Sequence, residues 1–250
     1  MDNRFVSGRT RLCGIIGDPI EHTMSPAMHN AAFAETGLDY RYLPFRVKRE
    51  DLAQAIAGIR ALNIRGINVT IPHKVAVIPL LDKLDPLAEK IGAINTIVND
   101  NGALQGYNTD AAGFLRALRE SGVEPGGKEV VILGAGGASR AISFILCQQE
   151  AHLIILNRRE ELDWAEELAS RLSQTHRREV KAQELTRNNL SRALAQADIL
   201  VNATSVGMSP GIGASLVPAR LLKPSLVVFD AVYNPIKTRL LQEAEQAGAK

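Results

Sequence analysis

Residues 129 to 158 follow the order of a buried strand, a glycine-rich turn, an amphipathic helix and a second strand. The first run, EVVIL, is short, apolar and largely β-branched, and Gly134, Ala135, Gly136 and Gly137 follow it directly. Residues with little or no side chain let the chain turn sharply and let backbone NH groups approach a pyrophosphate at a helix N-terminus. This order predicts a dinucleotide-binding βαβ unit with the phosphates at the turn.

The residues at the end of the second strand indicate which nucleotide is bound. An acid about 20 residues past the turn would bond an unsubstituted ribose, whereas arginine there accommodates a 2′-phosphate. Asn157, Arg158 and Arg159 occupy this region, so NADP is favoured over NAD. Glu160 and Glu161 follow directly, and two roles stay open for them: first-turn helix acids, or acids that repel the additional phosphate.

The composition is that of a soluble globular protein, because 46% of the 250 residues are hydrophobic and 22% are charged. A net charge of +2 does not favour a nucleic-acid partner. No run of about 18 apolar residues and no N-terminal basic-then-apolar segment occurs, so we expect a cytoplasmic protein with no membrane partner. Monomer and homodimer both stay open, since an amphipathic helix looks alike against a core or a partner.

Strand and helix signals alternate through the first half of the chain, which predicts an α/β layer architecture. Asn101-Gly102 is a two-residue hairpin signal, so the last two strands of this half are antiparallel and the sheet is mixed. The expected strands are 12–16, 40–47, 66–71, 94–98 and 103–108, and the expected helices are 26–35, 51–62, one from His73 and one around 87–91.

The second half predicts a doubly wound parallel sheet, with strands near 129, 153, 180, 198 and 226 and helices between them. We place the domain boundary at a helix over 111–121, which gives domains 1–110 and 111–250. Ligands of such sheets lie outside the carboxyl ends of the strands. Asn202, Thr204 and Ser205 follow the strand DILVN at that location.

Short polar segments in the first half contain the candidate catalytic residues. Each residue alone also suits a structural role: Ser25 before Pro26 suits a helix N-cap, Lys74 a solvated position, and Asp110 a helix cap. Taken together, hydroxyl and amide groups with one lysine and one carboxylate suit a small polyhydroxylated acid. A lysine ammonium can give a proton to an alkoxide that forms during hydride transfer, and a neighbouring carboxylate keeps it charged. We therefore predict a dehydrogenase that uses Lys74 and Asp110 and no metal.

A metal site is the competing interpretation of the histidines. His22, His29 and His73 with Asp18 could form one, but no H-x-x-x-H or C-x-x-C spacing supports it. His73 is better suited to the start of a helix beside Lys74.

An ordered set of strings resembles the shikimate dehydrogenase family: IIGDPIEHTMSPAMHN, GINVTIPHK, GAINT, GYNTD, GAGGASR, NATSVGM and DAVYNP, from residue 15 to residue 235. The resemblance implies NADPH-dependent, reversible reduction of 3-dehydroshikimate to shikimate. It also implies an N-terminal substrate domain with a mixed sheet, a Rossmann-type NADP domain and an active site in the cleft between them.

The resemblance implies a role for each matching residue. The catalytic pair is Lys74 and Asp110. The substrate-binding residues are Thr23, Ser25 and Tyr233 for the carboxylate, and Asn68, Thr70, Asn95 and Asp110 for the ring hydroxyls. The cofactor-binding residues are Gly134, Ala135, Gly136, Gly137 and Ala138 at the diphosphate, Asn157, Arg158 and Arg159 at the adenosine phosphate, and Thr204.

The chain departs from the family pattern at three places. Thr23 replaces the usual serine and keeps its hydroxyl. Arg159 and Trp164 stand, with a two-residue insertion, where the family has threonine and a second arginine. The sequence ends before the C-terminal return helix that the family pattern leads us to expect, and two explanations stay open: the sequence stops early, or the protein lacks this helix. Two alternatives therefore stay open: a quinate or shikimate dehydrogenase that uses NAD, and a non-catalytic sensor of such ligands.

Overall fold

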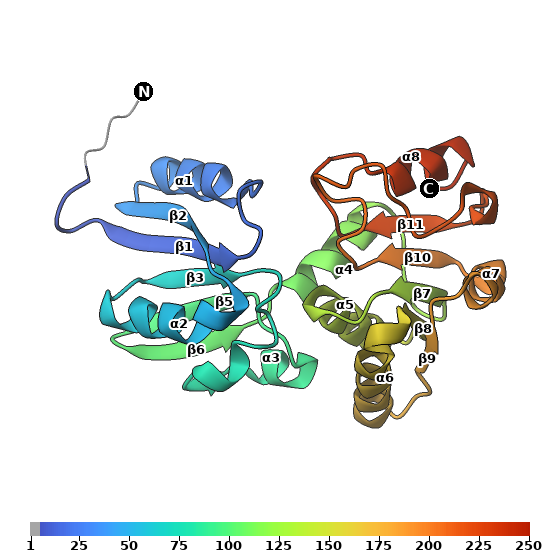
Figure 1. Cartoon of the computed structure of the whole chain (residues 1–250), viewed down its shortest axis with the longest axis horizontal. Helices are drawn as coiled ribbons and strands as arrows, with labels where there is room; N and C mark the ends of the chain where they lie inside the picture. The colour runs from blue at the N-terminus through green and yellow to red at the C-terminus, as the bar shows by residue number, and fades with distance from the viewer. Residues whose placement is uncertain (1–5) are drawn as a thin grey trace. The chain divides into compact units, whose positions relative to one another are not determined.

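The computed structural model describes residues 6–250 and divides into two compact units (Figure 1). The first unit ends at Thr109, and the second extends from Asp110 to Lys250. Each is an α/β structure with its own sheet and its own buried core.

The sheet of the first unit has the strand order β2-β1-β3-β5-β6-β4 (Figure 1). β1 pairs in parallel with β2 and β3, whereas β5 runs antiparallel to β3 and β6, so the predicted mixed sheet is confirmed. The strands are β1 (Arg11–Gly17), β2 (Tyr40–Arg46), β3 (Gly66–Val69), β4 (Lys83–Leu84), β5 (Thr96–Asp100) and β6 (Ala103–Tyr107). The helices are α1 (Ser25–Glu35), α2 (Leu52–Ala61) and α3 (Pro86–Ile91), with 3₁₀ turns η1 (Arg49–Asp51) and η2 (Ile78–Leu80).

The hairpin between β5 and β6 forms as its two central residues predict. Asp100 pairs with Ala103, and Asn101 and Gly102 both have positive φ, 51° and 92°. Such a turn matches the right-handed twist of the flanking strands.

Alternation along β3 separates the core of the first unit from its polar face. Ile67 and Val69 are buried in one apolar cluster with Ile56 and Ile59 of α2. Asn68, between them, points to the opposite face, because successive side chains of a strand alternate. The same pleat that buries the core therefore presents Asn68 to the α1 side of the sheet.

The helix expected from His73 does not form. The segment after Ile71 consists of turns and reaches only the 3₁₀ turn η2. Val75, Val77 and Ile78 are β-branched, which lowers helix propensity, and Pro79 has no NH to continue an α-helix.

The second unit has the parallel strand order β11-β10-β7-β8-β9 (Figure 1). β7 comes first in the chain and lies in the middle, so the direction of winding reverses between β7 and β10. This is the predicted doubly wound sheet. Its strands are β7 (Glu129–Leu133), β8 (His152–Asn157), β9 (Lys181–Glu184), β10 (Ile199–Asn202) and β11 (Val227–Asp230). Its helices are α4 (Asp110–Glu120), α5 (Gly137–Gln148), α6 (Leu162–His176), α7 (Arg187–Gln196) and α8 (Arg239–Gln246), with 3₁₀ turns η3 (Arg159–Glu161) and η4 (Ala219–Leu221).

Apolar side chains cover both faces of this sheet. Val131 and Leu133 of β7 are buried with Leu190 and Leu194 of α7, in a cluster that extends to α8. On the other face, the ring of Phe114 in α4 meets that of Phe229 in β11 edge to face, with centroids 4.7 Å apart. Strands buried on both faces read as continuous apolar runs, which is why EVVIL and DILVN were recognisable.

One expected helix of the second half is missing. Between β10 and β11 only η4 forms, and α8 follows β11 instead. Pro210, Gly211, Gly213 and Pro218 interrupt this stretch, and both residue types disfavour a helix interior. Across residues 6–250, none of the helices combines the length and apolarity needed to cross a bilayer.

We expect Gly14→Ala to lower the free energy of unfolding by about 1–3 kcal/mol, the usual range for overpacking. A Cβ at Gly14 would press against the carbonyl oxygen of Leu43 and lie 2.6 Å from the Phe45 ring. Gly58→Ala, in α2, is the matched control: its Cβ would meet nothing within 4 Å, so about 0.5–1 kcal/mol of stabilisation is expected. Urea unfolding of both variants measures the difference, and equal effects would contradict it.

Candidate functional site

Three predicted polar segments of the first unit meet at one edge of its sheet. Ile16 of β1 pairs with Val69 of β3, and Asn68 pairs with Thr96, which pairs in turn with Tyr107. The residues after β1, β3 and β6 and those before β5 therefore lie at the same edge. This pairing brings Thr70 and Asn95 to one edge of the sheet.

Asn95 is the centre of a hydrogen-bond network at this edge. Its Nδ2 donates to Thr109 Oγ1 at 2.7 Å, and its Oδ1 accepts from Thr109 N and Thr96 Oγ1, both at 3.0 Å. The side chain is thus fixed from both ends. Thr109, the residue directly before Asp110, is fixed with it.

Asn68 is held by a residue that the sequence analysis did not identify. Tyr42 donates its hydroxyl to Asn68 Oδ1 at 2.6 Å, and Asn68 Nδ2 donates to Thr96 Oγ1 at 3.0 Å. Tyr42 is 2% exposed, and the His29 ring stacks on it with centroids 4.3 Å apart. A tyrosine in the middle of a predicted strand, where a buried hydroxyl needs a partner, was the available signal.

Thr23 and Ser25 lie together at the start of α1. The backbone NH of Ser25 donates to Thr23 Oγ1 at 3.3 Å. Ser25 is the first residue of the helix and Met24 the cap, so the N-cap role considered for Ser25 is wrong. Asn30 ties the helix to β2 through both the NH and the carbonyl of Tyr42, each at 2.9 Å.

The backbone around Lys74 is fixed although it is not helical. The carbonyl of Lys74 accepts from Ile94 N at 2.8 Å, which places it beside the segment of Asn95. His73 is fully buried, and its Nε2 lies 2.7 Å from the carbonyl oxygen of Val47. Asp110 is the first residue of α4 and belongs to the second unit, so its pairing with Lys74 stays a prediction.

The histidines considered for a metal site have other contacts. His73 is bonded to Val47, His29 stacks on Tyr42, and Asp18 pairs with Arg46 at 2.8 Å. Over the described part of the chain, no three His, Cys, Asp or Glu side chains gather in a way that could hold a metal ion.

In the second unit, the glycine-rich turn meets Thr204 where the winding of the sheet reverses. Gly134 follows β7 with φ at +96°, and a Cβ there would lie 2.8 Å from Thr204 Cγ2. Both the left-handed backbone and the close approach require glycine. β7 and β10 are neighbours in parallel, so residues after both strands share the crevice where such sheets bind ligands.

The N-terminus of α5 is open at this turn. Gly136 caps the helix without a side-chain hydrogen bond, and a Cβ on it would meet nothing within 4 Å. Gly137 and Ala138 begin the helix, whereas Ala135 is buried. Backbone NH groups of the first turn therefore face no capping side chain, which suits a phosphate.

Arg158, one of the residues predicted to bind the adenosine phosphate, is paired with an acid in this structure. Arg158 donates its guanidinium to the carboxylate of Glu161, and this pairing raises the pKa of Arg158. Asn157, which is buried, donates its Nδ2 to the carbonyl oxygen of Glu161 at 2.6 Å. Arg159 is exposed in the 3₁₀ turn that follows.

A chain of polar side chains fixes the loops after β10 and β11. Thr204 Oγ1 donates to Asn202 Oδ1 at 2.7 Å, and Asn202 Nδ2 donates to Asp230 Oδ1 at 2.9 Å. Thr238, the cap of α8, donates to Asp230 Oδ2 at 2.6 Å. Asp230 and Thr238 were not predicted as part of this chain of side chains, because nothing local in the sequence links them to Thr204. Tyr233, in the loop after β11, has a ring that is 60% exposed, and its role beside Thr23 and Ser25 stays a prediction.

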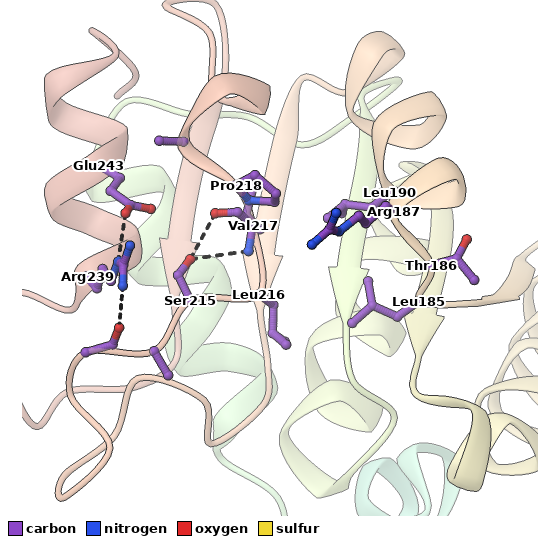
Figure 2. A pocket seen from close by; sticks show the side chains of 13 residues that line it. Leu185, Thr186, Arg187, Leu190, Ser215, Leu216, Val217, Pro218, Arg239 and Glu243 are labelled. Atoms are coloured by element: carbon purple, nitrogen blue, oxygen red, sulfur yellow. Dashed lines mark hydrogen bonds and ion pairs between the residues drawn. The ribbon is translucent and has the colours of Figure 1, made fainter.

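A pocket of about 560 Å³ opens elsewhere on the second unit (Figure 2). Figure 2 shows Arg239 beside Glu243. Arg239 Nε donates to Glu243 Oε1 at 2.8 Å, and its Nη1 donates to the loop carbonyl of Gly213 at 2.7 Å. None of the predicted nucleotide-binding residues lines it. Since the protein itself satisfies this arginine, we assign the pocket no part in catalysis.

Two family models match the chain in succession. The model described as shikimate dehydrogenase substrate binding domain matches residues 15–97. The model described as shikimate / quinate 5-dehydrogenase matches residues 118–230.

Individual proteins match over nearly the whole chain. A shikimate dehydrogenase (NADP(+)) from Dehalococcoides mccartyi strain CBDB1 is 52% identical, over 96% of this chain and 83% of its own length. A shikimate dehydrogenase crystallised with NADP⁺ has a TM-score of 0.89 at 42% identity, over 98% of this chain and 85% of its own. Shikimate 5-dehydrogenase from Listeria monocytogenes, in complex with shikimate and NAD, has a TM-score of 0.85 at 42% identity, over 98% and 86%.

We expect Asp230→Asn to change how stability depends on pH. Burial raises the pKa of Asp230 above its ordinary value of 3.8, and the hydrogen bond from Thr238 only partly opposes this. The folded state then binds the proton more tightly than the unfolded state, so this carboxyl lowers the free energy of unfolding as pH rises from 3.8. Urea unfolding at a series of pH values should show a smaller decline in the variant. A wild-type minus variant difference that is constant with pH would contradict the assignment.

Proposed function

Since the chain belongs to the shikimate dehydrogenase family, we propose that it catalyses the reversible, NADPH-dependent reduction of 3-dehydroshikimate to shikimate. The observation that carries this proposal is the 52% identity to a shikimate dehydrogenase (NADP(+)) across 96% of the chain. The polar edge of the first unit and the open glycine turn of the second supply the two binding surfaces that such a reaction requires.

In this proposal one domain binds the substrate and the other binds the nucleotide. Residues 1–110 form the substrate-binding domain, and residues 111–250 form the NADP-binding domain. The network around Asn95 supports the first assignment, because it presents amide and hydroxyl groups at the sheet edge. The doubly wound order of the second sheet, with Gly134 at its point of reversal, supports the second.

The substrate is held by groups matched to its chemistry. Thr23 and Ser25 bind the carboxylate together with Tyr233, since hydroxyl groups donate well to an anionic oxygen. Asn68, Thr70 and Asn95 bind ring hydroxyls. Their fixed hydrogen bonds to Tyr42 and Thr109 orient the amides before substrate arrives, and this lowers the entropy lost on binding.

Proton transfer is the work of Lys74 and Asp110. The ammonium of Lys74 donates a proton to the alkoxide that develops when the ketone is reduced, and the same amine accepts it in the reverse direction. The carboxylate of Asp110 holds the ammonium in place and bonds a ring hydroxyl. NADPH, when bound, supplies the hydride.

The nucleotide is bound by backbone at one end and side chains at the other. The NH groups of Gly136, Gly137 and Ala138 at the N-terminus of α5 bind the diphosphate, with Gly134 and Ala135 shaping the turn. Asn157, Arg158 and Arg159 bind the adenosine phosphate. Thr204 borders the crevice beside Gly134.

A direct assay tests the proposed reaction. Purified protein with shikimate and NADP⁺ should generate the near-ultraviolet absorbance of NADPH. Quinate in place of shikimate, and NAD⁺ in place of NADP⁺, should each give lower kcat/KM. Higher kcat/KM with quinate and NAD⁺ would contradict the assignment of substrate and cofactor, and binding without turnover would identify a sensor instead of an enzyme.

We expect Lys74→Ala to lower kcat by about a hundredfold or more, the range for a positioned acid-base group, with a smaller change in KM. Lys83→Ala, which removes an exposed lysine from β4 of the same unit, is the matched control and should retain wild-type kcat. Steady-state kinetics with both variants make the comparison. Turnover near the wild-type value in Lys74→Ala would contradict the role.

A further inference from the structure

We propose that Glu161 determines cofactor specificity by competing with the 2′-phosphate of NADP for Arg158, and so weakens the preference for NADP over NAD. This inference rests on the proposed function, because it concerns the same nucleotide site. It assigns to Glu161 a role opposite to that of Asn157, Arg158 and Arg159, which are predicted to bind the adenosine phosphate.

The pair is formed by neighbours on one turn. Arg158 follows β8, and its guanidinium hydrogen-bonds the carboxylate of Glu161, three residues along the chain. The arginine side chain is 65% exposed and that of Glu161 only 25% exposed. The Glu161 side chain is therefore the more buried member of the pair, and the Arg158 side chain is the more exposed one.

The backbone of Glu161 is fixed by two further hydrogen bonds. Its NH donates to the carbonyl oxygen of Arg158 at 3.1 Å, and its own carbonyl oxygen accepts from Asn157 Nδ2 at 2.6 Å. Asn157 is 5% exposed. A buried side chain therefore anchors the turn and holds the backbone of Glu161 at the position from which its carboxylate reaches Arg158.

A 2′-phosphate must displace this carboxylate to use the same donor. Glu161 Oε1 occupies one guanidinium donor of Arg158, Nη2. A phosphate oxygen accepts from the same kind of donor, so the two acids compete for this nitrogen. The segment 158–163 carries two arginines and three acids, Glu160, Glu161 and Asp163, so its formal net charge is −1 before any phosphate binds. The phosphate dianion therefore meets a local charge of its own sign.

NAD has no 2′-phosphate to compete with Glu161 for Arg158. Its ribose carries a neutral 2′-hydroxyl, and an acid about 20 residues past the glycine turn is the group that bonds such a hydroxyl. Glu161 can accept that hydrogen bond without losing Arg158. The carboxylate thus opposes NADP alone.

The test compares dissociation constants of NADP⁺ and NAD⁺, measured by isothermal titration calorimetry on the full chain. In Glu161→Gln, NADP⁺ should bind about tenfold more tightly, whereas NAD⁺ should change by no more than about twofold. Glu160→Gln is the matched control: it removes the same charge from the adjacent residue, but no hydrogen bond to Arg158. Its ratio of the two constants should move by less than about threefold.

Each outcome has a definite meaning. An unchanged ratio in Glu161→Gln, or an equal change in Glu160→Gln, would overturn the inference, the latter by showing a general charge effect. Without Arg158, the Glu161→Gln change should no longer tighten NADP⁺ binding, so the double variant Arg158→Ala/Glu161→Gln should bind NADP⁺ as Arg158→Ala does. Tighter NADP⁺ binding by the double variant would also overturn the inference. Retained NAD⁺ binding verifies that each variant is folded. Wild-type protein that binds neither nucleotide would overturn the proposed function, and the inference with it.

Discussion

The parallel pairing of β7 with β10 is the constraint on which the nucleotide-binding half depends. Because the two strands run side by side in the same direction, the chain that leaves each one emerges at the same edge. The two exits then approach so closely that Gly134 can have no side chain. The close approach of the two strand ends therefore requires a residue with no side chain at position 134. The same lack of a side chain leaves room for Thr204 on one side of the turn and for a phosphate on the other.

The first unit reaches a comparable result with a mixed sheet. Its antiparallel strand β5 enters at the edge where β1 and β3 leave, so Asn95 before β5 lies among residues that follow parallel strands. Residues distant in the sequence become neighbours through strand direction alone. A hydrogen bond from Tyr42 then fixes the amide of Asn68, and a hydrogen bond from Asn95 to Thr109 fixes the amide of Asn95.

Local chemistry made most of the fold predictable from the sequence. The β-branched runs, the Asn101-Gly102 turn and the glycine turn each specify a backbone shape within a few residues. The strands of both sheets formed where expected, except for the two-residue strand β4, which was not predicted. The helix expected from His73 was wrong because the β-branched residues and Pro79 outweighed the weak helix-start signal.

The contacts that fix the candidate site were harder to predict. The predicted residues Thr70 and Asn95 lie at one edge. Tyr42, which bonds Asn68, and Asp230, which bonds Asn202, come from other strands, and nothing in the sequence near Asn68 or Asn202 points to them. The Arg158–Glu161 pair was visible only as two nearby charges of opposite sign. Whether they would meet depended on the 3₁₀ turn between them, which sequence propensity does not specify.

Thr204 illustrates how one side chain can serve two requirements through different atoms. Its hydroxyl is fully committed within the protein, donating to Asn202 and accepting from Val206 N at 3.1 Å. Its methyl carbon is the atom directed toward Gly134. Serine would keep the hydroxyl bonds to Asn202 and Val206 but lack the methyl carbon that faces Gly134. Valine would keep a methyl carbon there but lose both hydrogen bonds of the hydroxyl. Of these three residues, only threonine supplies both the hydroxyl that fixes the loop and the methyl carbon that faces Gly134.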